Sequence, residues 1–480
     1  MKIAFAVSEA APFIKTGGLG DVAGALPDAL AAAGHEITVF LPLYGRVKHG
    51  EYFDRFSFVA GFQTELGWRR QYTGLFTFCE GPGKPRFCFI DNEYYFDRTE
   101  GTGIYGEFDD GERFAFFSRA VIESLSRLEF VPDVIHCNDW QTALIPVFLR
   151  VFYPEYDGVR TLFTIHNIEY QGIMPFEFAG DVAGLFGKDA ESVEFGGDVN
   201  LMKGAIERSD AVSTVSQTYS REIMYEYYSH GLHNILSSCS FKLHGIVNGI
   251  DTDVYNPATD PYIEANYSAD DFDGKAKNKK FLQKTLGLKV NAKTPLIGMV
   301  SRLVPHKGID LVERVIDEIV GCGVQFAVLG TGDERFEEMF RQAHARHPDM
   351  ISASITFSSR LASQIYAGCD IFLMPSKSEP CGLSQMVAMR YGAVPVVRET
   401  GGLKDTVPAY RIIKREGRGF TFWDYNAHEM MGAVRRATAF YRAEPEEFAG
   451  LQKRNMLCDF SWSVSVKKYI ELYRSLTDGE

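Results

Sequence analysis

The sequence has no excess of positive charge, no paired cysteine motif and no long apolar run. Its 50 Lys and Arg residues against 63 Asp and Glu give a formal net charge of -13. This balance argues against a long nucleic acid as partner, because phosphate backbones attract basic surfaces. None of the eight cysteines forms a C-x-x-C pair, so a zinc ribbon or redox motif is unsupported. No stretch reaches the roughly 18 apolar residues of a membrane span, and we expect a cytoplasmic protein without a membrane segment.

The length indicates a globular chain of two domains, and the N-terminus is interpreted as its first strand. With 480 residues, the chain is too long for one hydrophobic core and is expected to form domains of roughly 200 residues or more. The apolar run Met1 to Val7 resembles the start of a signal peptide. It is short, however, and Glu9 and Lys15 follow it closely, so we interpret it as the first buried strand.

Apolar strands alternate with helical stretches in both halves of the chain. Strands are expected at residues 3–7, 37–41, 134–136, 161–165, 211–215, 296–300, 325–329, 371–374 and 394–397, and helices at 22–33, 310–320 and 334–345. Continuous apolar strands between helices are typical of a parallel sheet covered on both faces. We predict two doubly wound α/β domains, residues 1–245 and 246–459, with ligands bound in a cleft at the carboxyl ends of the strands.

The glycine-containing loop 15–21 follows the first strand. Gly17 and Gly18 allow a close approach of the backbone to a ligand, and the following helix offers free N–H groups. Lys15 adds a cation, so the loop could bind an anion. The orders of the Walker loop and of G-x-G-x-x-G are both absent, and a simple strand-to-helix turn remains an equally good interpretation.

Three loops of the second half follow predicted strands in the same way. Arg302 and Lys307 come after strand 296–300 and are either phosphate ligands or solvated surface cations. Glu379 lies before a predicted helix, where a carboxylate commonly acts as a cap. The turn Thr400-Gly401-Gly402 could donate backbone N–H groups to a diphosphate or merely reverse the chain.

Polar residues also close two strands of the first half. Asp139 and His166 each follow an apolar strand, where a lone histidine more often serves the structure than catalysis. Asp251-Thr252-Asp253 has the D-x-D form of some metal-dependent glycosyltransferases. This form is common by chance, and its position after Asn248-Gly249 favours a linker, so no metal is assigned.

In this order and spacing, the loops resemble those of the bacterial glycogen synthases and the plant starch synthases. The similarity runs from residue 1 to about residue 475. The motifs that carry it are Lys-Thr-Gly-Gly-Leu-Gly-Asp-Val at 15–22, Asn-Asp-Trp at 138–140, Thr-Ile-His-Asn at 164–167, Asn-Gly-Ile-Asp at 248–251, Ser-Arg-Leu at 301–303 with Lys307-Gly308, Glu-Pro-Cys-Gly-Leu at 379–383 and Thr-Gly-Gly-Leu at 400–403.

The resemblance implies a fold, a reaction and its substrates. The fold would be GT-B, with two Rossmann-like domains facing across a cleft and the last segment, 460–480, packed on the first domain. ADP-glucose would be the donor substrate, and the non-reducing end of an α-1,4-glucan, such as glycogen or a maltooligosaccharide, the acceptor. The resemblance implies retention of the α-configuration with no cofactor and no metal, and it leaves the oligomeric state open.

The resemblance also implies roles for single residues. The implied catalytic residues are His166 beside the transferred glucose, Arg302 and Lys307 on the diphosphate, Glu379 near the sugar hydroxyls, and Asp139. The implied substrate-binding residues are Lys15, Gly17, Gly18, Asp21, Asn167, Asn248, Phe357, Cys381, Gly382, Leu383, Thr400, Gly401 and Gly402. Three positions depart from the family pattern. Phe357 stands where the family usually has a tyrosine, Asn138 where many members have a histidine, and His306 where a glutamine is frequent.

Other functions stay open at this point. One is transfer from UDP-glucose or synthesis of a small glycoside. Another is a sugar-nucleotide-binding regulator without catalysis, although the presence of Lys15, His166, Arg302, Lys307 and Glu379 together argues against a mere binding module. A pyridoxal-phosphate glucan phosphorylase shares the architecture but is usually much longer.

Overall fold

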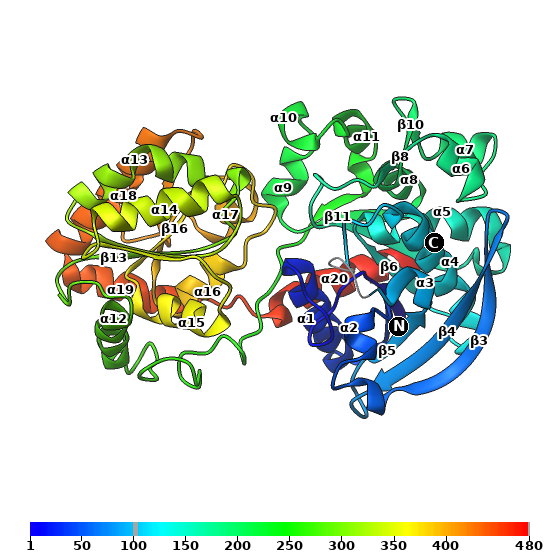
Figure 1. Cartoon of the computed structure of the whole chain (residues 1–480), viewed down its shortest axis with the longest axis horizontal. Helices are drawn as coiled ribbons and strands as arrows, with labels where there is room; N and C mark the ends of the chain where they lie inside the picture. The colour runs from blue at the N-terminus through cyan, green and yellow to red at the C-terminus, as the bar shows by residue number, and fades with distance from the viewer. Residues whose placement is uncertain (99–103, 479–480) are drawn as a thin grey trace. The chain divides into compact units, whose positions relative to one another are not determined.

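The computed structural model describes residues 1–98 and 104–478 and contains two compact units (Figure 1). Unit 1 comprises Met1–Asn248 together with the chain from Trp462 onward, and unit 2 comprises Gly249–Ser461. Each unit has its own sheet with helices on it, and the predicted fold class of two doubly wound α/β domains is confirmed. Residues 479 and 480 of the expected C-terminal segment lie outside the described residues.

The main sheet of unit 1 is almost entirely parallel. Across the described residues its nine strands follow the order β12-β11-β7-β6-β1-β2-β5-β4-β3, and β4 runs antiparallel to both of its neighbours. The strands are β1 Lys2–Ala6, β2 Glu36–Pro42, β3 Ser57–Leu66, β4 Arg69–Cys79, β5 Arg86–Asp91, β6 Val134–Asn138, β7 Arg160–Ile165, β11 Ala211–Thr214 and β12 Leu243–Gly245. The order reverses between β1 and β6, and open sheets bind ligands at the carboxyl ends of strands at such a switch point.

Helices of unit 1 cover this sheet. The chain between β7 and β11 forms a small antiparallel sheet, β8-β10-β9. The helices are α1 Gly18–Ala32, α2 Gly45–Lys48, α3 Glu93–Phe96, α4 Asp110–Arg127, α5 Leu144–Phe152, α6 Glu177–Asp181, α7 Lys188–Glu191, α8 Leu201–Arg208, α9 Gln217–Glu222, α10 Glu226–Ser229, α11 His233–Ser238 and α20 Trp462–Thr477; the small strands are β8 Ile173–Met174, β9 Glu194–Phe195 and β10 Asp198–Asn200. Trp462 and Tyr473 of α20 belong to the core of this unit. The C-terminal helix is thereby part of unit 1.

Unit 2 is built on a fully parallel sheet. Its described strands follow the order β15-β14-β13-β16-β17-β18, which matches the order 3-2-1-4-5-6 of dinucleotide-binding folds. They are β13 Leu296–Val300, β14 Gln325–Leu329, β15 Ile351–Ser354, β16 Ile371–Met374, β17 Val394–Arg398 and β18 Phe420–Phe422. The switch point lies between β13 and β16, so the loops after these two strands are expected to meet.

The helices of unit 2 include one that the sequence pattern hid. They are α12 Asp273–Thr285, α13 Ile309–Gly321, α14 Glu334–Arg346, α15 Ser359–Gly368, α16 Ser384–Arg390, α17 Gly401–Thr406, α18 Ala427–Ala443 and α19 Pro445–Met456. Residues 268–280, a stretch rich in Asp and Lys between the two halves of the chain, contribute the first half of α12. It packs because Lys275 is buried with its ammonium donating to the carbonyls of Tyr366, at 3.0 Å, and Tyr391, at 2.7 Å.

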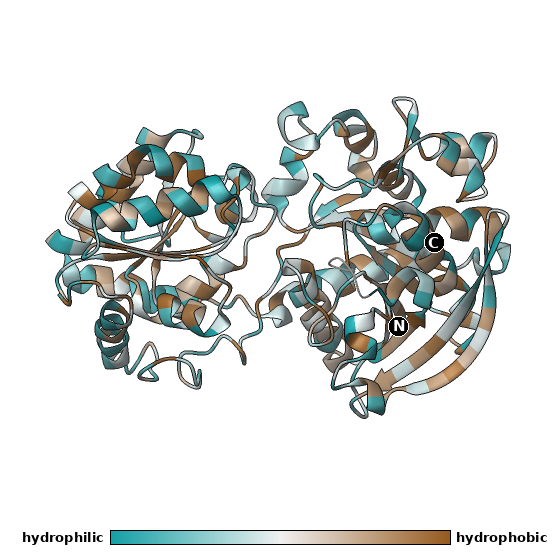
Figure 2. Ribbon diagram, viewed as in Figure 1, coloured by the Kyte–Doolittle hydropathy of each residue, from teal (hydrophilic) through white to brown (hydrophobic). Residues whose placement is uncertain are grey.

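Hydropathy explains why these segments are strands. The central strands of both sheets are coloured as hydrophobic in Figure 2, and every residue of β14 and β16 is buried. Continuous burial on both faces is what an all-apolar strand between two helical layers requires. In the described part of the chain, none of the helices combines the length and apolar character that a membrane span needs.

Candidate active site

Glu9 organises the glycine loop after β1. The helix α1 begins at Gly18, four residues before the expected start at Val22, because a carboxylate from outside the helix caps it. Glu9 accepts the backbone N–H of Gly20 at 3.1 Å and both the backbone N–H and the hydroxyl of Thr16 at 2.6 Å. Glu9 is 2% exposed. It takes the place of an N-cap side chain, which the cap residue Gly17 does not have.

Lys15 and Asp21 pair with each other on the surface of unit 1. The ammonium of Lys15 lies 2.6 Å from Asp21 Oδ1, and both side chains are more than one-third exposed. An added Cβ at Gly20 would lie 2.9 Å from the Lys15 side chain, so the lysine stem rests directly on the first turn of α1. The two predicted binding residues are therefore neighbours, and the lysine is accessible to a ligand.

Asp139 stands at the switch point of unit 1 in a strained conformation. It follows β6 with φ 57° and ψ 179°, a combination that is essentially restricted to glycine. Its Oδ1 accepts the backbone N–H groups of His166, at 2.7 Å, and Asn167, at 3.4 Å, at the end of the neighbouring strand β7. Strain of this kind persists where the surroundings enforce it, and it concentrates at functional sites.

Burial shifts the two titrating groups of this cluster in opposite directions. Desolvation raises the pKa of Asp139 to about 7, although the hydrogen bonds that it accepts from two backbone N–H groups oppose this shift. Desolvation also lowers the pKa of His166 to about 3. At neutral pH His166 is therefore a neutral imidazole, while Asp139 is close to its point of titration.

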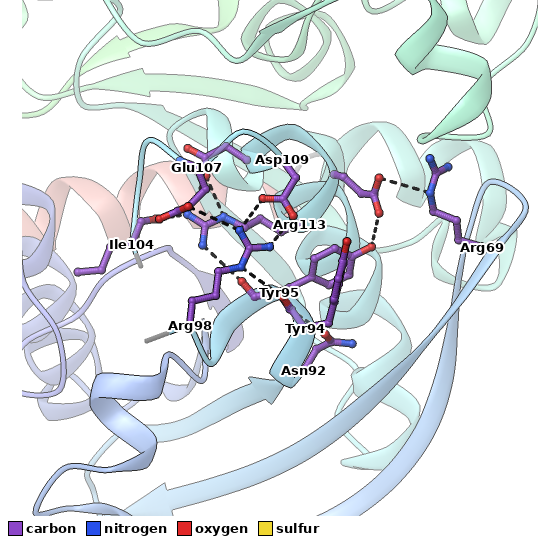
Figure 3. Close-up of polar contacts among 11 residues, drawn as sticks. Arg69, Asn92, Tyr94, Tyr95, Arg98, Ile104, Glu107, Asp109 and Arg113 are labelled. Atoms are coloured by element: carbon purple, nitrogen blue, oxygen red, sulfur yellow. Dashed lines mark hydrogen bonds and ion pairs between the residues drawn. The ribbon is translucent and has the colours of Figure 1, made fainter. Parts of the chain in front are cut away.

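Two arginines hold residues 104–109, which directly precede α4 (Figure 3). Arg98 donates to Asp109 at 2.7 Å, and the fully buried Arg113 donates to the carbonyl of Ile104 at 2.7 Å. The following residue, Tyr105, places its hydroxyl 2.8 Å from the Ser8 hydroxyl, next to Glu9 in sequence. The hydrogen bond between Tyr105 and Ser8 attaches this segment to the end of β1, where the candidate site of unit 1 lies.

Lys307 and Glu379 meet at the switch point of unit 2. Lys307 follows β13, Glu379 follows β16, and the lysine ammonium lies 2.8 Å and 2.7 Å from the two carboxylate oxygens. The hydroxyl of Ser376 donates to the same carboxylate at 2.8 Å. The alternative in which Glu379 caps the next helix is wrong, because α16 begins at Ser384 and has no side-chain cap.

Arg302 has a different environment from Lys307, its expected partner on a diphosphate. It is exposed, and its guanidinium lies 3.5 Å from the ring nitrogen Nε2 of His306. The charge of Lys307 is already paired with a buried carboxylate, whereas Arg302 presents its charge to solvent. Arg302 is therefore the more accessible of the two cations.

The second glycine turn supports the loop that carries Glu379. Gly402 donates its N–H to the carbonyl of Glu379 at 3.1 Å. A Cβ added at Gly401, which has φ 44°, would lie 2.0 Å from the Glu379 carbonyl oxygen, and one at Gly402 would lie 2.0 Å from that of Cys381. Glycine is required at both positions because two backbones touch there.

The remaining predicted residues differ in how far they are exposed. Buried members are Cys381, Thr400 and Asn248; half-buried members are Asn167 and Leu383; and Gly382 has φ 71°. Asn248 Oδ1 has no hydrogen-bond partner among the described residues. Phe357 is 86% exposed, directly before the Ser358 that caps α15, so its ring offers a free face for stacking.

The D-x-D sequence forms a turn. Asp251 Oδ1 accepts the backbone N–H groups of Asp253, at 2.9 Å, and Val254, at 3.0 Å. Within residues 1–98 and 104–478, no group of three or more His, Cys, Asp and Glu side chains gathers in a way that could hold a metal.

Sequence reasoning missed Glu9, Ser376 and the contact of Asn138 with His166. Glu9 served only as evidence against a signal peptide. The sequence signal that could have identified Glu9 is its position as a lone carboxylate between an apolar strand and a glycine loop. Asn138 Oδ1 lies 2.9 Å from His166 Nε2, a contact between two strand ends that no local spacing reveals.

Comparison with known families assigns both units. The model of the starch synthase catalytic domain matches residues 2–238, and that of glycosyl transferases group 1 matches residues 285–439. The glycogen synthase of Desulforamulus reducens is 46% identical over 99% of each chain. The chain belongs to the glycogen synthase family of glycosyltransferases. The predicted family and the GT-B fold class are thereby confirmed.

Further members of this family and a solved structure agree. The glycogen synthase of Geobacillus thermodenitrificans is 47% identical over all of this chain and 99% of its own. The catalytic domain of starch synthase IV from Arabidopsis thaliana, bound to ADP and acarbose, has 35% identity and a TM-score of 0.89 over 99% of both chains. The similarity to this glycogen synthase family therefore extends through both units.

Proposed function

We propose that this chain elongates an α-1,4-glucan by transferring glucose from ADP-glucose to the non-reducing end, with retention of the α-configuration. The observation that carries the proposal is the full-length similarity to glycogen synthases, 46% identity in the D. reducens protein. The starch synthase IV domain is bound to ADP and acarbose. That complex supports an adenine nucleotide on the donor side and a glucan-like ligand on the acceptor side.

Cleavage of the bond between glucose and ADP places negative charge on the departing diphosphate. We propose that Arg302 and Lys307 stabilise this charge as it develops, assisted by the backbone N–H groups of the glycine turns. Preorganised donors of this kind each contribute roughly 2.7–4 kcal/mol to the transition state. Glu379 holds the Lys307 ammonium in place and approaches the sugar hydroxyls, and the exposed ring of Phe357 stacks on the adenine.

Unit 1 contributes groups that orient the sugar. We propose that neutral His166 hydrogen-bonds the transferred glucose and that Asp139 fixes the backbone from which His166 projects. Lys15, on the first turn of α1, acts as a donor-binding cation. The fixed positions of these groups reduce the reorganisation needed to reach the transition state.

The test is a transfer assay with purified protein, glycogen and radiolabelled donor. We expect incorporation from ADP-glucose at a higher kcat/KM than from UDP-glucose. Preference for UDP-glucose would contradict the proposed donor. Tight binding of ADP-glucose without any transfer to glycogen would identify a regulator and contradict the proposed reaction.

A further inference from the structure

Asn138 is a buried amide with contacts on both of its ends. It closes β6 and is 0% exposed. Its Nδ2 group donates to the carbonyl of Ala6 at 3.0 Å and lies 3.4 Å from the carbonyl of His136. Its Oδ1 faces His166 Nε2 at 2.9 Å. The side chain thus connects the ends of β1 and β6 to the imidazole at the end of β7.

The carbonyl of Ala6 decides which way this amide points. If the amide were rotated by 180°, Oδ1 of Asn138 would face the Ala6 oxygen, and two acceptors would meet without a proton between them. The NH2 group of Asn138 must therefore face the carbonyls, and Oδ1 must face His166. Because a carbonyl oxygen only accepts, the proton of this contact has to sit on His166 Nε2.

The second ring nitrogen of His166 then carries no proton. Burial lowers the pKa of His166 to about 3, so the neutral ring has a single N–H at pH 7. That proton is committed to Asn138, which leaves Nδ1 as an acceptor. Among the described residues no hydrogen bond reaches Nδ1, while the backbone N–H of His166 is held by Asp139 at 2.7 Å.

We propose that Asn138 is a positioning residue: it fixes His166 in the tautomer with the proton on Nε2, so that Nδ1 accepts a hydrogen bond from one hydroxyl of the transferred glucose. The inference rests on the proposed function, which places His166 beside that sugar. Asn138 is fully buried and acts through His166 rather than on the substrate. The sugar hydroxyl at this position must donate its hydrogen to Nδ1, so the site selects a hydrogen-bond donor there.

The tautomer can be read directly from ¹⁵N NMR of histidine-labelled protein, with the His166 signal assigned from its absence in His166→Ala. We expect Nε2 protonated and Nδ1 unprotonated in the wild type. Asn138→Leu removes the acceptor that faces Nε2 and should release a mixture of tautomers. A wild-type ring protonated on Nδ1 would overturn the proposal, and this measurement does not depend on whether the chain transfers glucose.

The acceptor role is tested with ADP-glucose analogues in which single hydroxyls are replaced by fluorine, which cannot donate. For each analogue we compare kcat with that of unmodified ADP-glucose. We expect one analogue to lower kcat about tenfold more in the wild type than in Asn138→Leu, because only the wild type loses a hydrogen bond. Equal losses in both proteins for every analogue would overturn the proposal. Failure of unmodified ADP-glucose to react would instead contradict the proposed function.

Asn278 provides a matched control for the loss of a buried amide. Like Asn138 it is buried, donates from Nδ2 to two carbonyls, those of Ala265 at 2.6 Å and Gly274 at 2.9 Å, and accepts with Oδ1, here from the N–H of Glu264. We expect Asn278→Leu to lower the melting temperature as Asn138→Leu does while leaving kcat and the NMR signals of His166 unchanged. An equal loss of kcat in both variants would reduce Asn138 to a structural role and contradict the proposal.

Discussion

The ammonium group of Lys307 lies within 2.8 Å of both carboxylate oxygens of Glu379, a residue 72 positions away in the sequence. The side chains are 18% and 7% exposed. Removal of either partner would leave a largely desolvated charge without its counter-ion, which costs more than the pair contributes by its presence. Lys307 is thus both a candidate catalytic cation and the support of Glu379.

Lys307→Ala and Arg302→Ala should lower activity alike but differ in stability. We expect kcat to fall about a hundredfold or more in each, because each removes a charge that the proposed reaction uses to stabilise the departing diphosphate. Lys307→Ala should also reduce the free energy of unfolding by about 1–3 kcal/mol, since Glu379 loses its partner, whereas the exposed Arg302 contributes little to folding. Urea unfolding and steady-state rates measure both effects.

Arg335→Ala is the matched control for this pair of variants. Arg335 is 71% exposed and forms a surface ion pair with Glu313, a contact that contributes about 0–1 kcal/mol. We expect an unchanged kcat. Unchanged turnover in Lys307→Ala or Arg302→Ala would remove the catalytic role from that residue.

Gly401→Ala should distort the loop that holds Glu379. A methyl group there would stand 2.0 Å from the Glu379 carbonyl oxygen, and the φ of 44° is unfavourable for alanine. We expect a lower melting temperature together with a kcat reduced at least tenfold, the factor that corresponds to about 1.4 kcal/mol in the barrier. Gly321→Ala, at the end of α13 where a Cβ has nothing within 4 Å, should leave kcat unchanged and should not lower the melting temperature, because alanine favours a helix more than glycine does. A similar result for the two variants would contradict this account of the turn.

The pH dependence of stability should reveal the raised pKa of Asp139. Burial raises this pKa from 3.8 to about 7, so the folded state keeps a proton that the unfolded state loses between these values. The contribution of Asp139 to stability therefore decreases as the pH rises through this window. His166, whose pKa falls from 6.5 to about 3, has the opposite effect between these two values, because the unfolded state binds the extra proton. In the wild type the two contributions largely cancel where their windows overlap.

Asp139→Asn removes one side of this balance. Asparagine keeps an acceptor for the N–H of His166 and closely matches aspartate in shape, so we expect the backbone conformation to be retained. We expect the unfolding free energy of the variant, minus that of the wild type, to increase steadily from pH about 4 to pH about 7. A difference that stays constant over this range, measured by urea unfolding, would show that the pKa of Asp139 is not raised.

Glucosyl transfer should not depend on a divalent cation. In the proposed reaction, Arg302 and Lys307 supply the positive charge next to the diphosphate. In the Asp251–Asp253 segment, the first carboxylate accepts backbone N–H groups. We expect the rate with ADP-glucose to be unchanged after prolonged treatment with a chelator. A loss of activity that Mg²⁺ or Mn²⁺ restores would contradict this prediction.

Much of the secondary structure could be predicted from the sequence because strands buried on both faces must be continuously apolar. The expected bounds of β13, Leu296–Val300, and β14, Gln325–Leu329, agree with the structure. The start of α1 was wrong, because glycine normally weakens a helix and the capping carboxylate, Glu9, lies outside the helix. Helix α12 was missed because its buried Lys275 has the appearance of a surface residue in sequence.

The sequence by itself determined the family, the two α/β units and the set of candidate residues, because each of these depends on local pattern and on motif order. Only the tertiary structure decided which candidates touch: Lys307 with Glu379, and Asn138 with His166. These contacts join the ends of different strands. They follow from the order of strands in each sheet, and that order is set by long-range packing, which no spacing along the chain records.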